Sequence, residues 1–231
     1  MKRIAVPLLL MGSYLVGCAT GPEADPQDPL EPLNRGVYSF NELLDRTLIK
    51  PVAEFYSQTV PTQVDESVTN FFNNLDDITV VVNDLLQIQS QQCLEDTSRF
   101  LFNTTFGLVG LFDVASDWGL PKRSQDFGQT LGYWGIGAGP YLVLPIWGPR
   151  TVRDSAGLVV DSWGDSVYRF EPIGARNGSI LLRDLDRRAD LLGGSRLLKE
   201  AALDQYTFVR ETYLQRRASL VAEKRGSGDE R

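Results

Sequence analysis

The stretch that most constrains the fold is the uncharged segment from Phe127 to Pro149, which contains no Asp, Glu, Lys or Arg. A helix of this length could cross a bilayer. Six glycines and three prolines interrupt it: Gly128, Gly132, Gly135, Gly137, Gly139, Gly148, Pro140, Pro145 and Pro149. Glycine weakens a helix and proline breaks one, so the segment is not a spanning helix. It is either a buried core loop or irregular backbone at membrane depth, which bilayers tolerate only where protein or a water-filled cavity supplies hydrogen bonds.

A second uncharged run, FLFNTTFGLVGLF, extends from Phe100 to Phe112 and is apolar on every side of a helical wheel. A helix of this kind is either fully buried or in contact with lipid. As a helix it would measure about 20 Å, which falls short of the ~30 Å hydrocarbon core of a bilayer. Hiding both uncharged runs inside one domain of this size is difficult, and this difficulty favours lipid contact.

The chain has no histidine, which excludes Ser-His-Asp and Cys-His nucleophilic sites and histidine-ligated zinc. The sequence also lacks a glycine-rich phosphate loop and the acidic spacing of a calcium loop. We therefore expect no enzyme, no metal and no cofactor. The net charge of the 231-residue chain is −7, which argues against nucleic acid as a partner.

The first 18 residues, MKRIAVPLLLMGSYLVGC, combine two positive charges with a short apolar run, as a secretory signal peptide does. The run ends in Leu15-Val16-Gly17-Cys18, which resembles the lipobox of bacterial lipoproteins. The resemblance implies cleavage before Cys18, a diacylglyceryl thioether on its sulfur and an acyl chain such as palmitate on its new amino group. The alternative is an ordinary signal peptide with an incidental cysteine. Ala19 in place of aspartate suggests the outer membrane.

The mature chain divides into a lipidated tether (18–27), one domain (28–217) and a tail expected to be disordered (218–231). Cleavage removes Lys2 and Arg3 and no acidic residue, so the net charge falls from −7 to −9. The tether reaches roughly 30 Å when extended, which places the body against the membrane that holds the lipid. With Cys18 modified, Cys93 has no disulfide partner and is expected to pack as a small hydrophobe.

The remaining periodicity predicts a mainly α-helical single domain without a substantial sheet. Helices are expected from Asn34 as N-cap to Leu48 with Pro51 as the stop, after Pro61, over 79–89, over 151–168, over 173–192 and after Ser195. Thr151 and Asp154 form a capping-box-like start, followed by an apolar face of Val152, Ala156, Val159, Val160, Trp163 and Val167. The last helix shows a stripe expected to be buried: Leu198, Ala202, Tyr206, Val209 and Tyr213.

Five segments in order resemble the MlaA (VacJ) family of outer-membrane lipoproteins. They are DPLEPLNR (28–35), DRTLIKPVA (45–53), NDLLQ (83–87), RFLFNTTFGLVGLFDVAS (99–116) and DFGQTLGYWGIGAGPYLVLPIWGPRTVRD (126–154). The resemblance covers nearly all of the mature chain, from about Asp28 to about Arg217. The chain departs from the family after Gln87, where Ile88-Gln89-Ser90-Gln91 replaces a glycine that many members have.

The resemblance implies a ring of amphipathic helices that lies in the inner leaflet of the outer membrane and encloses an amphipathic channel. Family members associate with trimeric porins and remove misplaced phospholipids from the outer leaflet. They pass the lipid to a soluble periplasmic carrier, which returns it toward an inner-membrane ATP-driven complex. The alternative is a porin-associated scaffold lipoprotein that moves no lipid; a lipase comes third, weakened by the missing histidine.

Polar residues within or beside the two uncharged runs are candidates for the lipid path, because a charged headgroup needs a polar lining to cross hydrocarbon. They are Asn103, Thr104, Thr105, Gln129, Thr130, Arg150 and Arg153, with Gly135 and Gly137 where a bulky side chain would block passage. Arg150 and Arg153 could pair with phosphate. The alternative is that Arg153 pairs with a carboxylate and the threonines bond to helix carbonyls. Phe40 and Asn41 are gating candidates, because the first helix of the family borders the lipid path.

Overall fold

The computed structural model describes residues 25–229, without the side chains of residues 197–201 and 227–229. The signal peptide, Cys18 and the tether up to residue 24 therefore lie outside the described residues. The described chain is mainly α-helical with a small two-stranded sheet, which confirms the predicted fold class.

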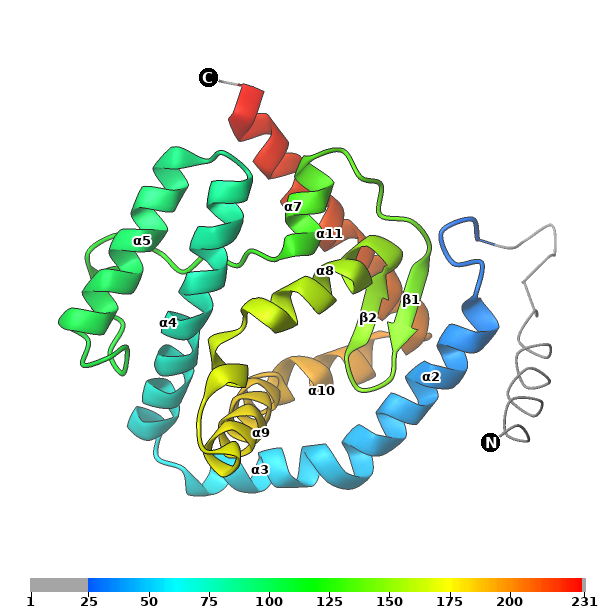
Figure 1. The fold of residues 1–231 in the computed structure, drawn as a ribbon. Helices are drawn as coiled ribbons and strands as arrows, with labels where there is room; N and C mark the ends of the chain where they lie inside the picture. Colours follow the sequence, from blue (N-terminus) through cyan, green and yellow to red (C-terminus); the bar gives the residue numbers. More distant parts are fainter. Residues whose placement is uncertain (1–24, 230–231) are drawn as a thin grey trace, which may run out of the picture.

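The helices and strands follow one another along the chain as a series of mostly short segments (Figure 1). They are α2 (Glu31–Leu44), a π-helical turn (Asp45–Ile49), α3 (Lys50–Thr59), α4 (Thr62–Leu86), α5 (Ser90–Thr105), α6 (Val114–Asp117), α7 (Phe127–Tyr133), β1 (Tyr141–Leu144), β2 (Gly148–Thr151), α8 (Val152–Gly164), a 3-10 turn (Ser166–Arg169), α9 (Ile173–Asp190), α10 (Leu192–Ala201) and α11 (Gln205–Asp229).

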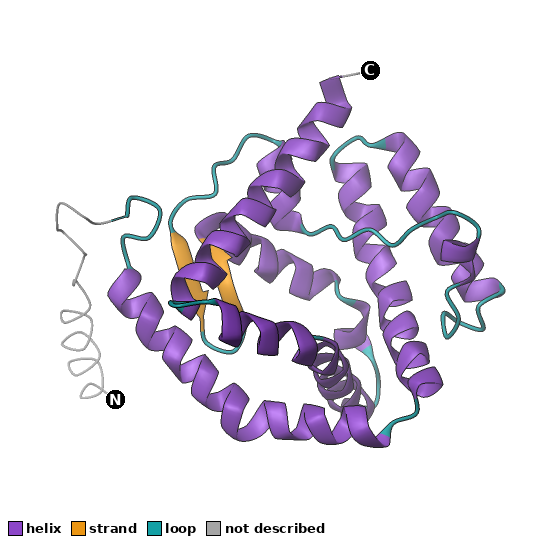
Figure 2. Ribbon diagram, turned by 180° about the vertical axis from the view of Figure 1, so that it is seen from behind, coloured by secondary structure: helices purple, strands orange, loops and turns teal. Residues whose placement is uncertain are grey.

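The elements form a closed circuit. α2 packs on β1, β1 pairs with β2, β2 contacts α11, α11 contacts α7, α7 contacts α4, and α4 follows α3 after two residues. Figures 1 and 2 show this ring from opposite sides, with α8 and α9 inside its outline. α9 packs on α3 and α4, and α8 packs on α7. The ring-like arrangement is therefore present in the fold.

The first helix differs from its prediction at both ends. It begins at Glu31, with Pro32 in its first turn, and Asn34 is a buried residue inside the helix and not its N-cap. Pro51 does not stop it, because Lys50 N donates to Asp45 O five residues back and the helix passes through a π-helical turn into α3. The wider turn accommodates the proline ring, whose clash with the preceding turn would break a regular α-helix.

Three other boundaries are corrected. The two segments expected after Pro61 and over 79–89 form the single helix α4, because no helix breaker separates them. The final helix is divided into α10 and α11. Where we expected a disordered tail from residue 218, α11 continues to Asp229, and Val221 and Lys224 are buried.

The β1–β2 hairpin was not predicted, because its strands are only four residues long. Tyr141 pairs with Thr151 and Leu144 with Gly148 in antiparallel register. The outer edge of β1 is covered by two carboxamides of α2: Asn34 accepts from Val143 N (2.9 Å) and donates to Tyr141 O (3.1 Å). Asn41 makes the same pair of bonds to the hairpin turn two helical turns later. Seven residues of helix rise about 10 Å, as do three residues of strand, so the spacings match.

Candidate functional site

The candidate site is the hollow of the ring together with the packed interior of the helices around it, and this packed interior is polar where that of a water-soluble protein would be apolar. Among the described residues, 22 polar or charged side chains are buried, against 10 hydrophobic ones. Conversely, large hydrophobic side chains are exposed on most of the helices. Asp, Glu, Lys and Arg are almost never fully buried in soluble proteins unless they are paired. The usual relation between inside and outside is therefore inverted here.

Helix α5 shows the inversion in one element. Its buried residues are Asp96, Arg99 and Asn103, which share one face at helical spacing. Leu94 and Leu101 on the same helix are 69% and 50% exposed. The helix is amphipathic as its sequence indicates, but its polar face points inward.

Helix α8 has the same orientation. Thr151 Oγ1 accepts from Asp154 N (3.2 Å), which confirms the predicted cap. The residues that α8 buries are Arg153, Asp154 and Gly157. Its predicted apolar face is largely exposed, with Trp163 78% accessible, and Val167 in the following turn is buried. Periodicity identified the face correctly without showing which way it points.

Helix α11 contributes a basic stripe to the interior: Arg210, Arg217 and Lys224 recur every seven residues and are each at most 8% exposed. Arg210 pairs with Asp28 (3.1 Å) and Asp25 (2.9 Å), which ties the start of the described chain to the last helix. Lys224 Nζ donates to Gln89 Oε1 (3.3 Å) in the turn between α4 and α5. The stripe thereby joins distant parts of the ring.

Arg217 holds together the ends of α7 and α8. Its guanidinium donates to Asp126 Oδ1 and to Asp154 Oδ1, both at 2.8 Å. Tyr213 OH donates to Asp154 Oδ2 (2.7 Å), and Arg153 donates to Asp154 Oδ1. Burial opposes ionisation of both aspartates, yet Arg217 keeps the pKa of each below its ordinary value. Both carboxylates therefore stay charged inside the protein.

A second cluster lies between α4, α5 and α6. Arg99 is 1% exposed and pairs with Asp113 (2.7 Å) and Asp77 (3.2 Å). Burial acts against the charge of Asp113, but hydrogen bonds from Arg99, Ser116 and Asn103 bring its pKa down to about 2. Burial raises the pKa of Asp77, although Lys122 and Arg99 act in the other direction. The interior thus holds fixed charges of both signs.

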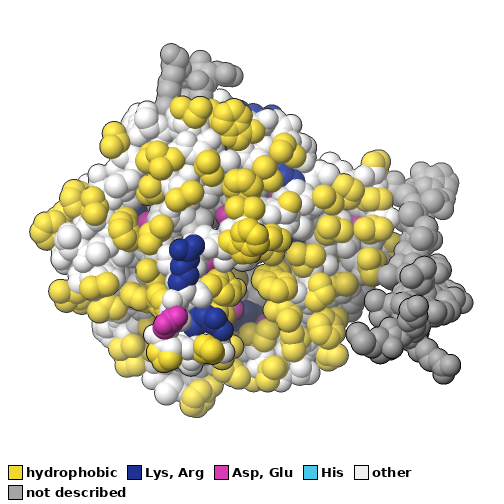
Figure 3. Space-filling view, viewed as in Figure 1, with side chains coloured by type: hydrophobic (Ala, Val, Ile, Leu, Met, Phe, Trp, Pro, Cys, Tyr) yellow, Lys and Arg dark blue, Asp and Glu magenta, His cyan; other side chains and the backbone are white. Residues whose placement is uncertain are grey.

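The surface of the ring is apolar around a polar hollow. Figure 3 shows, on the face seen in Figure 1, a hollow with basic and acidic side chains in or beside it and hydrophobic side chains over the surrounding surface. The run from Phe106 to Phe112 follows α5 as a loop, and Phe106, Leu108, Val109, Leu111 and Phe112 are between 40% and 64% exposed. Among the described residues, no helix combines the length and hydropathy that a membrane-crossing span needs.

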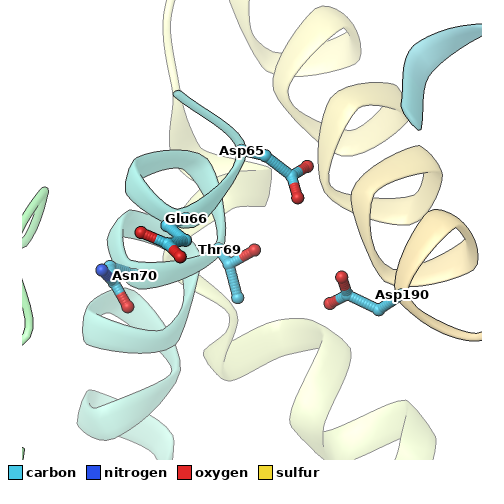
Figure 4. Close-up of a pocket in the computed structure, with 5 residues that line it drawn as sticks. All are labelled: Asp65, Glu66, Thr69, Asn70 and Asp190. Carbon is cyan, nitrogen blue, oxygen red and sulfur yellow. The ribbon is translucent and has the colours of Figure 1, made fainter. Parts of the chain in front are cut away.

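A separate pocket of about 310 Å³ lies between α4 and α9 and is acidic. Figure 4 shows Asp65, Glu66, Thr69 and Asn70 on α4, with Asp190 of α9 facing Asp65 and Thr69 across the gap. Burial and the charge of Asp65 both raise the pKa of Asp190. Nearby Asp186 accepts from Thr69 Oγ1 (3.1 Å) and Tyr56 OH (3.3 Å), and burial raises its pKa to about 6. This lining repels phosphate groups.

Three of the predicted path residues are buried in protein hydrogen bonds. Asn103 donates to Asp113 Oδ1 (2.9 Å) and accepts from Ala115 N (2.9 Å). Gln129 donates to Asp126 Oδ2 (3.2 Å), and Thr130 donates to Asn83 Oδ1 (2.6 Å). These residues stabilise the interior, and their contact with lipid stays a prediction.

The two threonines at the end of α5 are more accessible. Thr104 accepts from Asn74 Nδ2 (3.0 Å), and exposed Thr105 donates to Leu101 O (2.6 Å). The bond of Thr105 is the helix-carbonyl bond that we considered as an alternative.

The two arginines differ. Arg153 is 7% exposed and pairs with Asp154, so the carboxylate alternative describes it. Arg150 on β2 is half-buried, and its Nε makes no hydrogen bond within the described residues.

Gly135 and Gly137 are exposed in the loop between α7 and β1. Of the gating candidates, Phe40 is 52% exposed and Asn41 bonds to the hairpin.

Sequence reasoning missed the basic stripe of α11 and the acidic pocket. The recurrence of cations at positions 210, 217 and 224 was a usable signal, since residues seven apart share a helix face. The acidic pocket joins residues more than a hundred positions apart, and no local pattern indicates it.

Comparisons with known proteins agree with this architecture. The family model described as MlaA lipoprotein matches residues 26–220. The chain is 36% identical over 224 residues to the intermembrane phospholipid transport system lipoprotein MlaA of Escherichia coli, covering 94% of this chain and 88% of the relative. The protein of the same name in Haemophilus influenzae is 32% identical, with 90% and 86% covered. A solved structure, "Structural basis for maintenance of bacterial outer membrane lipid asymmetry", contains a chain that superposes with a TM-score of 0.74 at 33% identity, covering 84% of this chain and 98% of that one.

Proposed function

The chain belongs to the MlaA lipoprotein family, and from this membership we propose that it removes misplaced phospholipids from the outer leaflet of the outer membrane and so maintains lipid asymmetry. The relatives named above are lipoproteins of an intermembrane phospholipid transport system. The observation that carries the proposal is the inverted distribution of side chains, with a charged interior beneath an apolar surface.

The ring lies in the inner leaflet, anchored by lipid on Cys18. Exposed side chains such as Leu94, Leu101 and Trp163 contact hydrocarbon, where their exposure carries no free-energy penalty. In water, a protein with a surface of this kind would aggregate. We place the helices within the leaflet, because the buried faces of α5 and α8 are polar and their exposed faces are apolar. The backbone between α7 and β1 is irregular and finds its partners in surrounding protein.

A passage with polar groups beside it would lower the cost of moving a headgroup through hydrocarbon, and we place this passage at the polar hollow of the ring. An unpaired charge in an apolar medium costs several kcal/mol or more, and fixed polar groups reduce that cost. Arg150 is the best candidate for phosphate contact, because its side chain is only half-buried and forms no ion pair within the described residues, whereas Arg153 is buried and paired with Asp154. Phosphate should avoid the acidic pocket at Asp65 and Asp190.

The protein works with partners. We place a trimeric porin beside the ring and a soluble periplasmic carrier of the Mla type as the acceptor of the lipid, as the family resemblance implies. The chain itself carries out no covalent chemistry, and energy for directional return comes from an inner-membrane complex.

The test separates lipid transport from a scaffold function. Cells that lack the protein should accumulate phospholipid in the outer leaflet, measured by labelling of surface amines. When expressed in these cells, the Arg150→Ala protein should bind the porin but should not restore lipid asymmetry. The control protein Arg216→Ala, which is changed at an exposed site, should do both. A photo-cross-linker at Thr104 should capture phospholipid. If Arg150→Ala restores asymmetry fully and the interior captures no lipid, the protein is a scaffold.

A further inference from the structure

An apolar groove of about 480 Å³ lies along α2 and reaches the tip of the β1–β2 hairpin. It is lined by Pro32, Leu33, Gly36, Val37, Phe40 and Pro145, none of which is charged. Leu33 and Phe40 are 45% and 52% exposed. From residue 32 to residue 40 the helix rises about 12 Å, so the groove is elongated and follows the helix axis.

Gly36 keeps the groove open. A Cβ added at Gly36 would meet no atom within 4 Å, and its backbone has no positive φ that would demand glycine. Because glycine carries no side chain, this position leaves the groove unfilled along the helix.

The start of the described chain is fixed beside this groove. Asp25 and Asp28 pair with Arg210, and Gln27 O accepts from Tyr141 N (2.8 Å). Asn34 bonds to the same Tyr141 and to Asp28, so residues 25–28 lie next to the first turns of α2. Pro145 lies at the opposite end of the hairpin. The tether therefore enters at the end of the groove near Pro32.

We infer that this groove seats an acyl chain attached to Cys18. Residues 19–24 separate Cys18 from Asp25, and at no more than 3.6 Å per residue they allow about 25 Å of reach, which covers the groove. An uncharged groove suits hydrocarbon. The short tether keeps the attached chain within reach of the groove, and its effective concentration there rises as the tether shortens.

The inference rests on the proposed acylation of Cys18, which is part of the proposed function. Seating the anchor against α2 sets the depth of the ring in the leaflet, because the tether otherwise leaves the body free to move by its own length. The groove thus links the lipid anchor to the helix that covers the edge of β1.

The test uses the full chain in native membranes, with a diazirine-bearing amino acid at Leu33 and, in a separate protein, at Leu181 on α9, which is 71% exposed. After irradiation and digestion, the Leu33 probe should be joined to the acyl chain of the Cys18 peptide, and the Leu181 probe to phospholipid. If the Leu33 probe captures only phospholipid or another protein, or yields no product while Leu181 does, the inference is wrong.

Two variants sharpen the result. Gly36→Leu should lower the yield of the Leu33 product several-fold, because the new side chain fills the groove without clashing. A flexible insertion of glycine and serine after Thr20 should also lower it, because effective concentration falls as a linker lengthens. Unchanged yield in both would overturn the inference. The mass of the Cys18 peptide is measured separately, so missing acylation refutes the anchor itself and acylation without cross-linking refutes only the groove.

Discussion

Asn41 Oδ1 accepts a hydrogen bond from the backbone N–H of Ile146 at 2.9 Å, across 105 residues of sequence. The same carboxamide donates to Leu144 O at 2.9 Å, so one side chain of α2 holds both sides of the hairpin turn. Ile146 adopts a left-handed conformation with φ 71°, which a β-branched residue takes only where its surroundings impose it. The position of the hairpin tip therefore depends on α2.

Asn41→Ala should loosen the hairpin tip without unfolding the ring. Loss of the two bonds should cost about 1 kcal/mol and increase hydrogen exchange at the Ile146 amide. Because Asn41 is a gating candidate, we also expect altered lipid flow.

A deletion of Phe40 and Asn41 is the stronger form of the test. It turns the following helix by about 200° and should give leaky or reversed lipid flow. Wild-type phenotype in a stable deletion protein would contradict the gating role.

Arg217→Gln should destabilise the protein by about 2–3 kcal/mol, because half-buried Asp126 would lose its cation and buried Asp154 would keep only Arg153. Arg216→Gln is the matched control, because Arg216 is the residue next to Arg217 and its side chain is exposed. In the wild type, the lowered pKa values of Asp126 and Asp154 contribute to the free energy of unfolding above about pH 4. This contribution is lost as the pH falls through the pKa values of the folded state. The difference between variant and wild type should therefore shrink in acid. Denaturation in detergent at pH 7 and pH 3.5 measures it; equal differences would be inconsistent with this account.

Gly137→Leu should block transport while leaving the fold intact, because a Cβ at Gly137 meets no atom within 4 Å. Gly135 is a poorer choice, since its φ of +93° would strain any side chain. Gly178→Leu on α9 is the control, being equally open. Asymmetry and thermal stability are measured together. Normal transport by Gly137→Leu would place the path elsewhere.

Asp186→Asn should change the pH dependence of stability. Burial raises the pKa of Asp186 to about 6, so between about pH 4 and pH 6 the folded state binds more protons than the unfolded state. The extra proton that Asp186 binds in the folded state makes the wild type more stable as the pH falls from about 6 to about 4. The substituted carboxamide would retain an acceptor for Thr69 and Tyr56 but would not titrate, so the variant should lose this increment. Identical slopes in unfolding measurements at pH 4, 5, 6 and 7 would rule the assignment out.

Cys18→Ser should abolish acyl labelling and leave the signal peptide attached. The mature native protein should require detergent for extraction, because several acyl chains and an apolar body both hold it in the membrane. Labelling with an alkyne fatty acid measures the first effect. Normal labelling of Cys18→Ser would show that the lipid is elsewhere, and release of the native protein by carbonate would contradict embedding.

Features that depend on neighbouring residues could be predicted from the sequence. The cap at Thr151 depends on a bond over three residues, and the helical character of 151–164 and 173–190 follows from periodicity within each segment. The ring was predicted from the family resemblance carried by residues 99–116 and 126–154, and not from periodicity.

The direction of each helix face could not be read from the sequence. Periodicity places Val159 and Trp163 of α8 on one face and Arg153 and Asp154 on the other, and water or lipid decides which face is buried. The hairpin was missed because its strands are short and its edge is closed by side chains of a distant helix. Ile88, where the family resemblance led us to expect glycine, has a φ of 58°, so the chain makes a left-handed turn at this position.

The outward-facing hydrophobic side chains also affect how the protein reaches its membrane. A lipoprotein of the outer membrane must cross an aqueous compartment after its synthesis, and there Leu94, Trp163 and Leu181 would face water instead of hydrocarbon. Exposed apolar surface of this extent leads to self-association in aqueous solution. For the proposed outer-membrane location, an escort that shields only the acyl chains would leave these side chains in water on the way to the leaflet.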